Sequence, residues 1–190
     1  MGTLTHASLV EYLLEEAYEV VETIEEGHAD AELQAELGDV LLQVVLHARL
    51  AQERGAFTFD DVARGLAAKM VRRNPHVFRP DGSLQDSFPA TVAEIEQKWD
   101  AVKRAEKPHR VDPFEGIPQA LPALARAQKS LDRAQRAGLG LPGGVPVPDS
   151  EEELGELLLG VVRSARDAGL DAERALRGAI LRYQSDAAPS

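Results

Sequence analysis

The sequence has 190 residues, of which 44% are hydrophobic, and its formal net charge at pH 7 is −11. This length suits one hydrophobic core with a small appendage, and the acidic balance argues against general nucleic-acid binding, which needs lysine and arginine on the phosphates. The absence of cysteine excludes disulfide bonds and thiolate metal sites. No apolar run is long enough to span a membrane and the first residues lack a signal-peptide pattern, so we expect a cytoplasmic protein.

Apolar periodicity predicts two helices at the start of the chain, over residues 5–26 and 30–54, each followed by a glycine in the usual helix-stop role. Each helix carries two carboxylates three residues apart. The pairs are Glu16 with Glu19, and Glu36 with Asp39. Side chains at this spacing lie on one side of a helix, about one turn apart, so each pair can hold one cation. If the helices lie side by side, the four carboxylates repel one another, and a hard divalent cation with oxygen ligands removes that repulsion.

The ordinary alternative is that these acidic side chains face water, as most do. Glu16 lies at the border of the apolar stripe of its helix, between Leu13 and Val20. On the second helix, Asp39 lies on the side of a second apolar stripe that includes Leu42. A carboxylate on a packed face needs a cation or strong hydrogen-bond donors. We therefore expect Asp39 to lie on a packed face, and the interpretation that it merely faces water is weak for this residue.

A third helix is predicted to begin at a cap formed by Thr58 and Asp61 and to end before Pro75. Lys69 and Arg73 lie four residues apart on one face of this helix. In so acidic a chain, these two cations form a candidate site for a polyphosphate. The alternative is a solvated last turn, where basic side chains interact favourably with the helix dipole. The sequence leaves both interpretations open.

Residues 79–90 are rich in turn-forming residues and predict a loop, and a fourth helix is expected over residues 91–106. Trp99 lies on the apolar line of this helix, and Lys103 follows one turn later. A single tryptophan most often belongs to the core. With a lysine at i+4, it can also offer a stacking surface for a base beside a phosphate contact.

The chain contains a weak internal repeat, because ELGDVLLQVVLHAR from Glu36 recurs as ELGELLLGVVRSAR from Glu153. The second copy keeps the apolar pattern but not the full charged set, and a Pro/Gly-rich linker precedes it. Packing or dimer contact is its expected use. We therefore divide the chain into a first module that carries the candidate site, a connecting helix with the linker, and a degenerate half-repeat, at residues 1–110, 111–150 and 151–190.

Taken in order, these motifs resemble the MazG family of all-α nucleoside triphosphate pyrophosphohydrolases. The phrase KxxRRxPHVF begins at Lys69, the Trp99–Lys103 pair follows, and LPALxRAQK ends at Lys129. The resemblance covers most of residues 5–135 and, weakly, the remainder. One departure is Ala67, where the family often has asparagine. The family pattern EExxE, a spacer and ExxD is present at Glu15, Glu16, Glu19, Glu36 and Asp39.

The resemblance implies an all-α helical bundle of MazG type, dimeric, with a four-helix-bundle core. It also implies hydrolysis of a nucleoside or deoxynucleoside triphosphate to the monophosphate and pyrophosphate, a reaction that cleans the nucleotide pool. The base would lie against Trp99, and the triphosphate would contact Lys69, Arg73 and Lys103. The implied metal is Mg²⁺, for which Mn²⁺ can substitute, held by Glu16, Glu19, Glu36 and Asp39.

On this basis we expect metal-assisted attack of water at the linkage between the α- and β-phosphates. Glu19 or Glu15 would accept the proton of the water, and the basic side chains would stabilise the leaving pyrophosphate. The alternative is a catalytically weak or inactive helical dimer of the same descent that binds nucleotides or a partner protein. The loss of charged residues from the second repeat motivates this alternative.

Overall fold

The structure of the protein is a computed structural model, which describes residues 4–87 and 112–187 and, between them, residues 91, 94, 95, 98 and 102. Within these residues the regular elements are helices, apart from an isolated bridge between Phe78 and Leu84. This confirms the predicted all-α class. None of the described helices is long and apolar enough to cross a membrane. The chain divides into two compact units, Met1–Glu106 and Lys107–Ser190.

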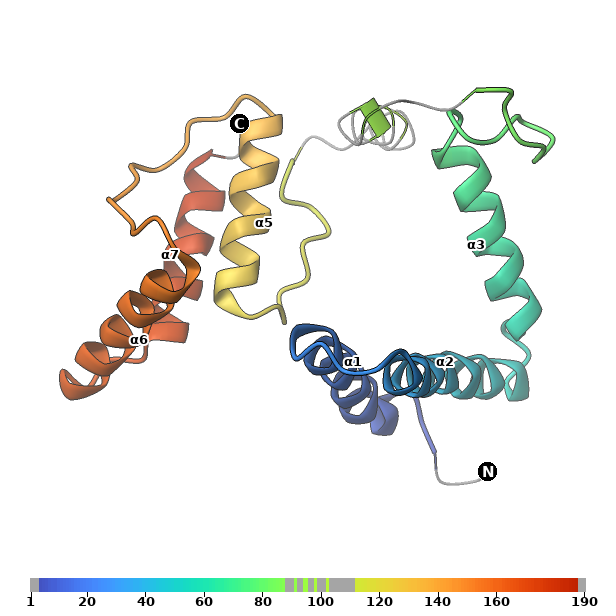
Figure 1. Ribbon diagram of the computed structural model, residues 1–190, viewed down its shortest axis with the longest axis horizontal. Coiled ribbons are helices and arrows are strands. Elements are labelled where there is room, and N and C mark those ends of the chain that lie inside the picture. The colour runs from blue at the N-terminus through green and yellow to red at the C-terminus, as the bar shows by residue number, and fades with distance from the viewer. Residues whose placement is uncertain are drawn as a thin grey trace. The chain divides into compact units, whose positions relative to one another are not determined.

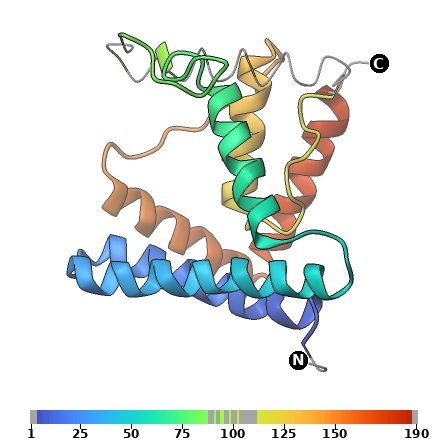
Figure 2. The same cartoon turned by 90° about the vertical axis from the view of Figure 1, so that its right-hand side faces the viewer.

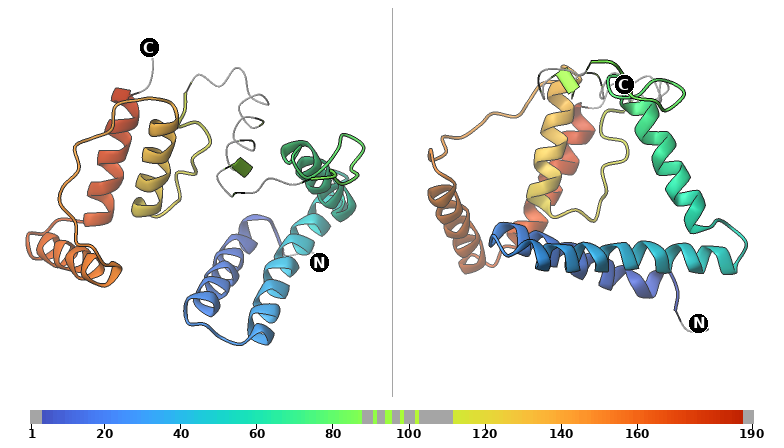
Figure 3. Two further views of the ribbon diagram at one scale, coloured as in Figure 1. Left: turned by 45° about the horizontal axis from the view of Figure 1, so that its top comes forward. Right: turned by 45° about the vertical axis from the view of Figure 1, so that its right-hand side comes forward.

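The first unit is built on a helical hairpin of α1 (Val10–Glu25) and α2 (Asp30–Glu53), preceded by the short 3-10 helix η1 (Ala7–Leu9). The two long helices pack against each other along the hairpin (Figure 1, Figure 3). Gly27, with φ of 67°, follows α1 as predicted, because glycine adopts this left-handed conformation at little cost. The second helix begins at Asp30, the first residue of the predicted range, and extended Ala29 is its N-cap.

The buried apolar residues of the hairpin and η1 are Leu9, Ala48 and Ala51, and the two small alanines leave room for close packing along α2. Two helices cannot cover all of their own apolar surface. Many large apolar side chains of α1 and α2 therefore stay exposed in the single chain, among them Tyr12, Leu14, Tyr18, Leu37, Leu41 and Leu42.

The third helix, α3 (Phe59–Arg73), begins with the predicted cap. The Thr58 hydroxyl accepts a hydrogen bond from the Asp61 backbone N–H at 3.2 Å, and the Asp61 carboxylate accepts one from the Thr58 N–H at 2.9 Å. Hydrogen bonds from Thr58, then from Arg64, lower the pKa of Asp61 to about 2. From this cap α3 leads away from the hairpin (Figure 1, Figure 2).

The second unit contains α5 (Ala123–Arg136), α6 (Glu151–Asp167) and α7 (Ala172–Ala187). Helices α5 and α7 lie side by side (Figure 2), and α6 contacts α7. Phe114 and Ile117 form a small core with Ala134. The Phe114 ring packs edge-on against Tyr183 of α7, with ring centroids 5.9 Å apart.

Candidate metal centre

Three of the four predicted metal ligands come together on the hairpin: Glu16 and Glu19 of α1, and Glu36 of α2. We call these three residues the acidic trio. One carboxylate oxygen from each lies within 4.8 Å of the others. Oxygens bound to one Mg²⁺ lie at most about 4.2 Å apart, twice the metal–oxygen distance. The acidic trio therefore needs only a small contraction to hold one ion, which rotation of its side chains can supply.

Negative charge gathers at the acidic trio. Withdrawal from water raises the pKa of Glu19, as do a hydrogen bond with Glu16 and the charges of Glu16, Glu36 and Glu15. Glu16 and Glu36 are half-buried, whereas Glu19 is exposed. A divalent cation with oxygen ligands would relieve this repulsion, so the donor atoms and their electrostatics suit such an ion.

Gln43 supports the acidic trio from α2 and was not anticipated from the sequence. Its side chain is buried, with 4% exposure, and its Nε2 donates to Glu16 Oε1 at 3.5 Å. Its Oε1 has no hydrogen-bond partner among the residues the structure describes. Gln43 lies two turns after Glu36 on the same face of α2. That seven-residue spacing is the sequence signal that could have identified it as a positioning residue for Glu16.

A pair of histidines, His6 and His47, lies at the same face of α2, one turn beyond Gln43. His6 Nδ1 lies 2.7 Å from His47 Nδ1, and the rings are stacked with centroids 5.1 Å apart. The Nε2 atoms of both rings are buried without a partner in the described part of the chain. Desolvation first, and then the charges of Arg54 and His47, lower the pKa of His6. The pair ties the start of the chain to α2, and a neutral His6 ring suits this environment.

The packed surroundings predicted for Asp39 are not present in the single chain. Asp39 is exposed and does not belong to the acidic trio. The cause is the rotation of α2 about its axis, which turns Gln43 and His47 toward α1 and η1. Asp39 lies on the flank of α2 that also carries Leu42, which is 48% exposed. Leu46 and Leu50 of that second apolar stripe are half-buried, so the exposed part of the stripe is the part beside Asp39.

Two of the predicted phosphate-binding residues, Lys69 and Arg73, do not adjoin the acidic trio in the single chain. Lys69 is exposed and Arg73 is half-buried, and both belong to the last two turns of α3, which leads away from the hairpin (Figure 1). Trp99 and Lys103 lie outside the described residues. Glu15 is exposed beside Glu16, close enough for its charge to raise the pKa of Glu19.

Comparison of the sequence with known proteins shows which family has this arrangement of helices and carboxylates. Residues 4–78 match the MazG nucleotide pyrophosphohydrolase domain. The chain is also 38% identical over 197 residues to the nucleoside triphosphate pyrophosphohydrolase/pyrophosphatase MazG of Thermotoga maritima, with 94% of this chain and 73% of that protein covered. The chain belongs to the MazG family.

Two further relatives cover a similar part of this MazG chain. The nucleoside triphosphate pyrophosphohydrolase of Escherichia coli is 35% identical over 204 residues, which cover 95% of this chain and 75% of that protein. An uncharacterised 26.1 kDa protein of Streptomyces cacaoi is 43% identical over 182 residues, with 95% and 71% covered. The matched domain spans α1, α2 and α3 and contains the whole acidic trio.

Proposed function

We propose that this MazG chain hydrolyses nucleoside and deoxynucleoside triphosphates to the monophosphate and pyrophosphate, and thereby removes unwanted nucleotides from the cytoplasmic pool. The observation that carries the proposal is the acidic trio on the hairpin of a MazG domain. The names of the relatives from Thermotoga maritima and Escherichia coli point to the same reaction.

The proposed metal is Mg²⁺, for which Mn²⁺ can substitute, and when bound it supplies charge neutralisation at the triphosphate and orientation of the attacking water. Glu16, Glu19 and Glu36 would hold the ion, and Asp39, on the exposed flank of α2, would be the fourth carboxylate. Gln43 fixes Glu16 through its 3.5 Å hydrogen bond. In this scheme Glu15, or Glu19 where it is not bound to the ion, accepts the proton of the water.

The remaining proposed contacts are basic and aromatic. Lys69, Arg73 and Lys103 stabilise the leaving pyrophosphate, and Trp99 stacks on the base. Because the end of α3 lies away from the acidic trio in the single chain, we assign the contacts of Lys69 and Arg73 to a dimer in which α3 of a second copy reaches the trio. The exposed apolar stripes of α1 and α2 supply a surface for such pairing.

Mixed dimers test this assignment. One chain carries Glu36→Gln and the other carries Lys69→Ala, and each of these variants is expected to be inactive by itself. If each site combines the trio of one chain with the α3 of the other, half of the sites in a mixed dimer regain both wild-type groups, and activity returns on mixing. If each site lies within one chain, every site keeps one defect and mixing restores nothing, which would contradict the assignment.

The reaction itself is tested by incubating the full chain with a panel of nucleoside and deoxynucleoside triphosphates. We expect monophosphate and pyrophosphate to appear in equal amounts with Mg²⁺, and neither to appear when a chelator removes the ion. Release of inorganic phosphate in place of pyrophosphate would contradict attack at the α/β linkage. Nucleotide binding without any product would favour the non-catalytic dimer.

A further inference from the structure

The second unit contains a buried cation, Arg126, in the motif LPALxRAQK. The proposed hydrolysis assigns no role to this residue. Arg126 of α5 is 4% exposed. Within the described residues its guanidinium makes one hydrogen bond, from Nη2 to Gln184 Oε1 of α7 at 3.2 Å, and its Nε is buried without a partner. No carboxylate of the described chain forms an ion pair with it. A buried charge without a counter-ion is costly, so the position of this arginine suits an anionic ligand.

A hydrogen-bonded ring holds the guanidinium in place. Ser130, which is 1% exposed, donates from its hydroxyl to the Arg126 carbonyl oxygen at 2.7 Å and accepts from Gln184 Nε2 at 2.9 Å. With Nε2 engaged in this way, the Oε1 atom of the Gln184 amide is left to face Arg126. The Arg126 side chain is therefore oriented before any ligand arrives, which lowers the entropic cost of binding.

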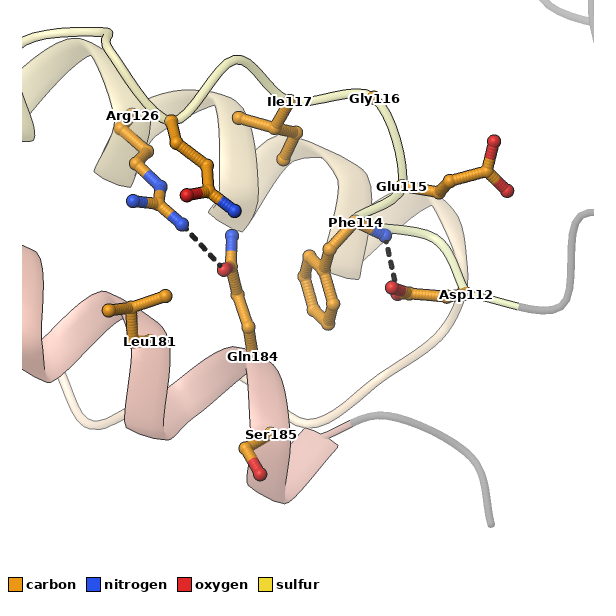
Figure 4. Close-up of a pocket in the computed structure, with 10 residues that line it drawn as sticks. Asp112, Phe114, Glu115, Gly116, Ile117, Arg126, Leu181, Gln184 and Ser185 are labelled. Atoms are coloured by element: carbon orange, nitrogen blue, oxygen red, sulfur yellow. Dashed lines mark hydrogen bonds between the residues drawn. The ribbon is translucent and has the colours of Figure 1, made fainter.

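Arg126 borders a cavity of about 390 Å³ between α5, α7 and the segment before α5, a volume at the lower end of small-molecule sites. Its walls include the apolar side chains of Phe114, Ile117 and Leu181. Figure 4 shows the guanidinium at one end of this cavity, the Phe114 ring beyond it, and Ser185 at the edge on α7.

The acidic side chains of the cavity lie away from Arg126. The Asp112 carboxylate accepts a hydrogen bond from the Phe114 N–H at 2.8 Å and lies on the far side of the ring, while Glu115 points outward (Figure 4). These two negative charges disfavour a polyanion such as a triphosphate. One cation beside an apolar wall instead favours a ligand with one anionic group and an apolar body.

We propose that this cavity binds a small molecule in which a single oxyanion, a carboxylate or a phosphate monoester, is joined to an apolar body, with the oxyanion on Arg126 and the body against Phe114, Ile117 and Leu181. The planar guanidinium matches both oxyanions with parallel N–H groups. This site lies wholly within the second unit and does not depend on the hydrolysis proposed for the first.

Calorimetric titration of the full chain tests the site with three probes of one shape: benzoate, phenyl phosphate and neutral benzyl alcohol. We expect saturable binding of at least one anion, with shifts of the Phe114 and Gly116 amide signals in ¹H–¹⁵N spectra, and markedly weaker binding of the alcohol. The stronger of the two anions identifies which oxyanion the site prefers. If neither anion binds, or if the alcohol binds equally well, the proposal is wrong.

Arg126→Met keeps an unbranched apolar stem and removes the charged guanidinium, and it should weaken anion binding by about tenfold or more. The matched control is Arg174→Met on the exposed face of α7, which makes the same change in net charge and should leave binding unchanged. Undiminished binding by a folded Arg126→Met chain would overturn the proposal.

A second pair of variants leaves Arg126 in place. Ser185 lines the cavity and is exposed, so it tolerates a larger side chain. Ser185→Glu adds a negative charge at the edge and should weaken binding several-fold, whereas Ser185→Gln, of equal size, should not. Equal affinities for these two variants would show that no anion lies near this edge, and would likewise overturn the proposal.

Discussion

The two units hold polar groups in opposite situations. On the hairpin, three carboxylates lie close together, partly open to water. Between α5 and α7, one guanidinium is buried and forms no ion pair with a carboxylate of the described residues. Water can solvate the excess charge of the acidic trio, so the trio can persist with no more than a raised pKa on Glu19. Arg126 has little access to water; its guanidinium donates a hydrogen bond to Gln184, which is held in place by donating to Ser130. Burial thus decides how strongly each site needs its partner ion.

The largest expected effect is on catalysis by the acidic trio. Glu36→Gln keeps the size of the side chain and removes one charged ligand, and we expect the rate of pyrophosphate release to fall by about a hundredfold or more, because the metal contributes several kcal/mol to the barrier. Glu22→Gln, on the exposed surface of α1, is the matched control and should retain activity. Full activity of Glu36→Gln would remove the acidic trio from the mechanism.

The next effect is on the positioning of Glu16. Gln43→Met preserves volume but removes the 3.5 Å hydrogen bond to Glu16, and we expect the affinity for Mg²⁺ to fall by about tenfold, as for other outer-shell partners of metal ligands. Mg²⁺-dependent melting measures this affinity, since a bound ion raises the melting temperature. Gln34→Met, on exposed α2 surface, should leave it unchanged. An unaltered affinity in Gln43→Met would reduce Gln43 to a packing residue.

A smaller effect distinguishes a binding arginine from a structural one. Because Arg126 is buried without a counter-ion, Arg126→Met should leave the free energy of unfolding unchanged or raise it by about 1 kcal/mol. Urea denaturation without ligand measures this free energy, with Arg174→Met as the reference. A loss of several kcal/mol would mean that the guanidinium stabilises the unit by itself.

The smallest effect concerns the histidine pair beside the acidic trio. The pKa of His6 lies below its ordinary value of 6.5, so the stability contributed by its neutral ring is fully present above about pH 6.5 and is lost as the pH falls through the lower folded-state pKa. The melting temperature should therefore fall less between about pH 7.5 and pH 5 in His6→Phe than in the wild type, since phenylalanine stacks but does not titrate. Parallel melting curves for the two chains would contradict this.

Local signals in the sequence predicted much of the first unit. Glycine at residue 27 and the Thr58–Asp61 cap mark real helix ends, because such conformations depend on neighbouring residues alone. The three-residue spacing of Glu16 and Glu19 likewise placed both on one helix face. The short connection between the two helices makes them neighbours, and this indicated that Glu36 would lie close to Glu16 and Glu19.

The errors and omissions concern contacts between distant segments. Whether Asp39 or Gln43 faces α1 depends on how α2 is rotated in the hairpin, and apolar stripes on two sides of α2 left that rotation open. The His6–His47 contact joins residues 41 positions apart. The burial of Arg126 depends on α7, and Gln184 lies 58 positions away. Periodicity describes each helix singly, so it does not reveal these pairings.

The short connection between α1 and α2 also has a consequence for the order of folding. All three members of the acidic trio come from neighbouring helices, so the site has low contact order and forms through the kind of contact that assembles fastest. During synthesis, the hairpin can close and capture an ion as soon as α2 has left the ribosome, before any of the second unit exists. The cavity around Arg126 requires α7, one of the last segments to be made, and is completed only when the chain is nearly finished.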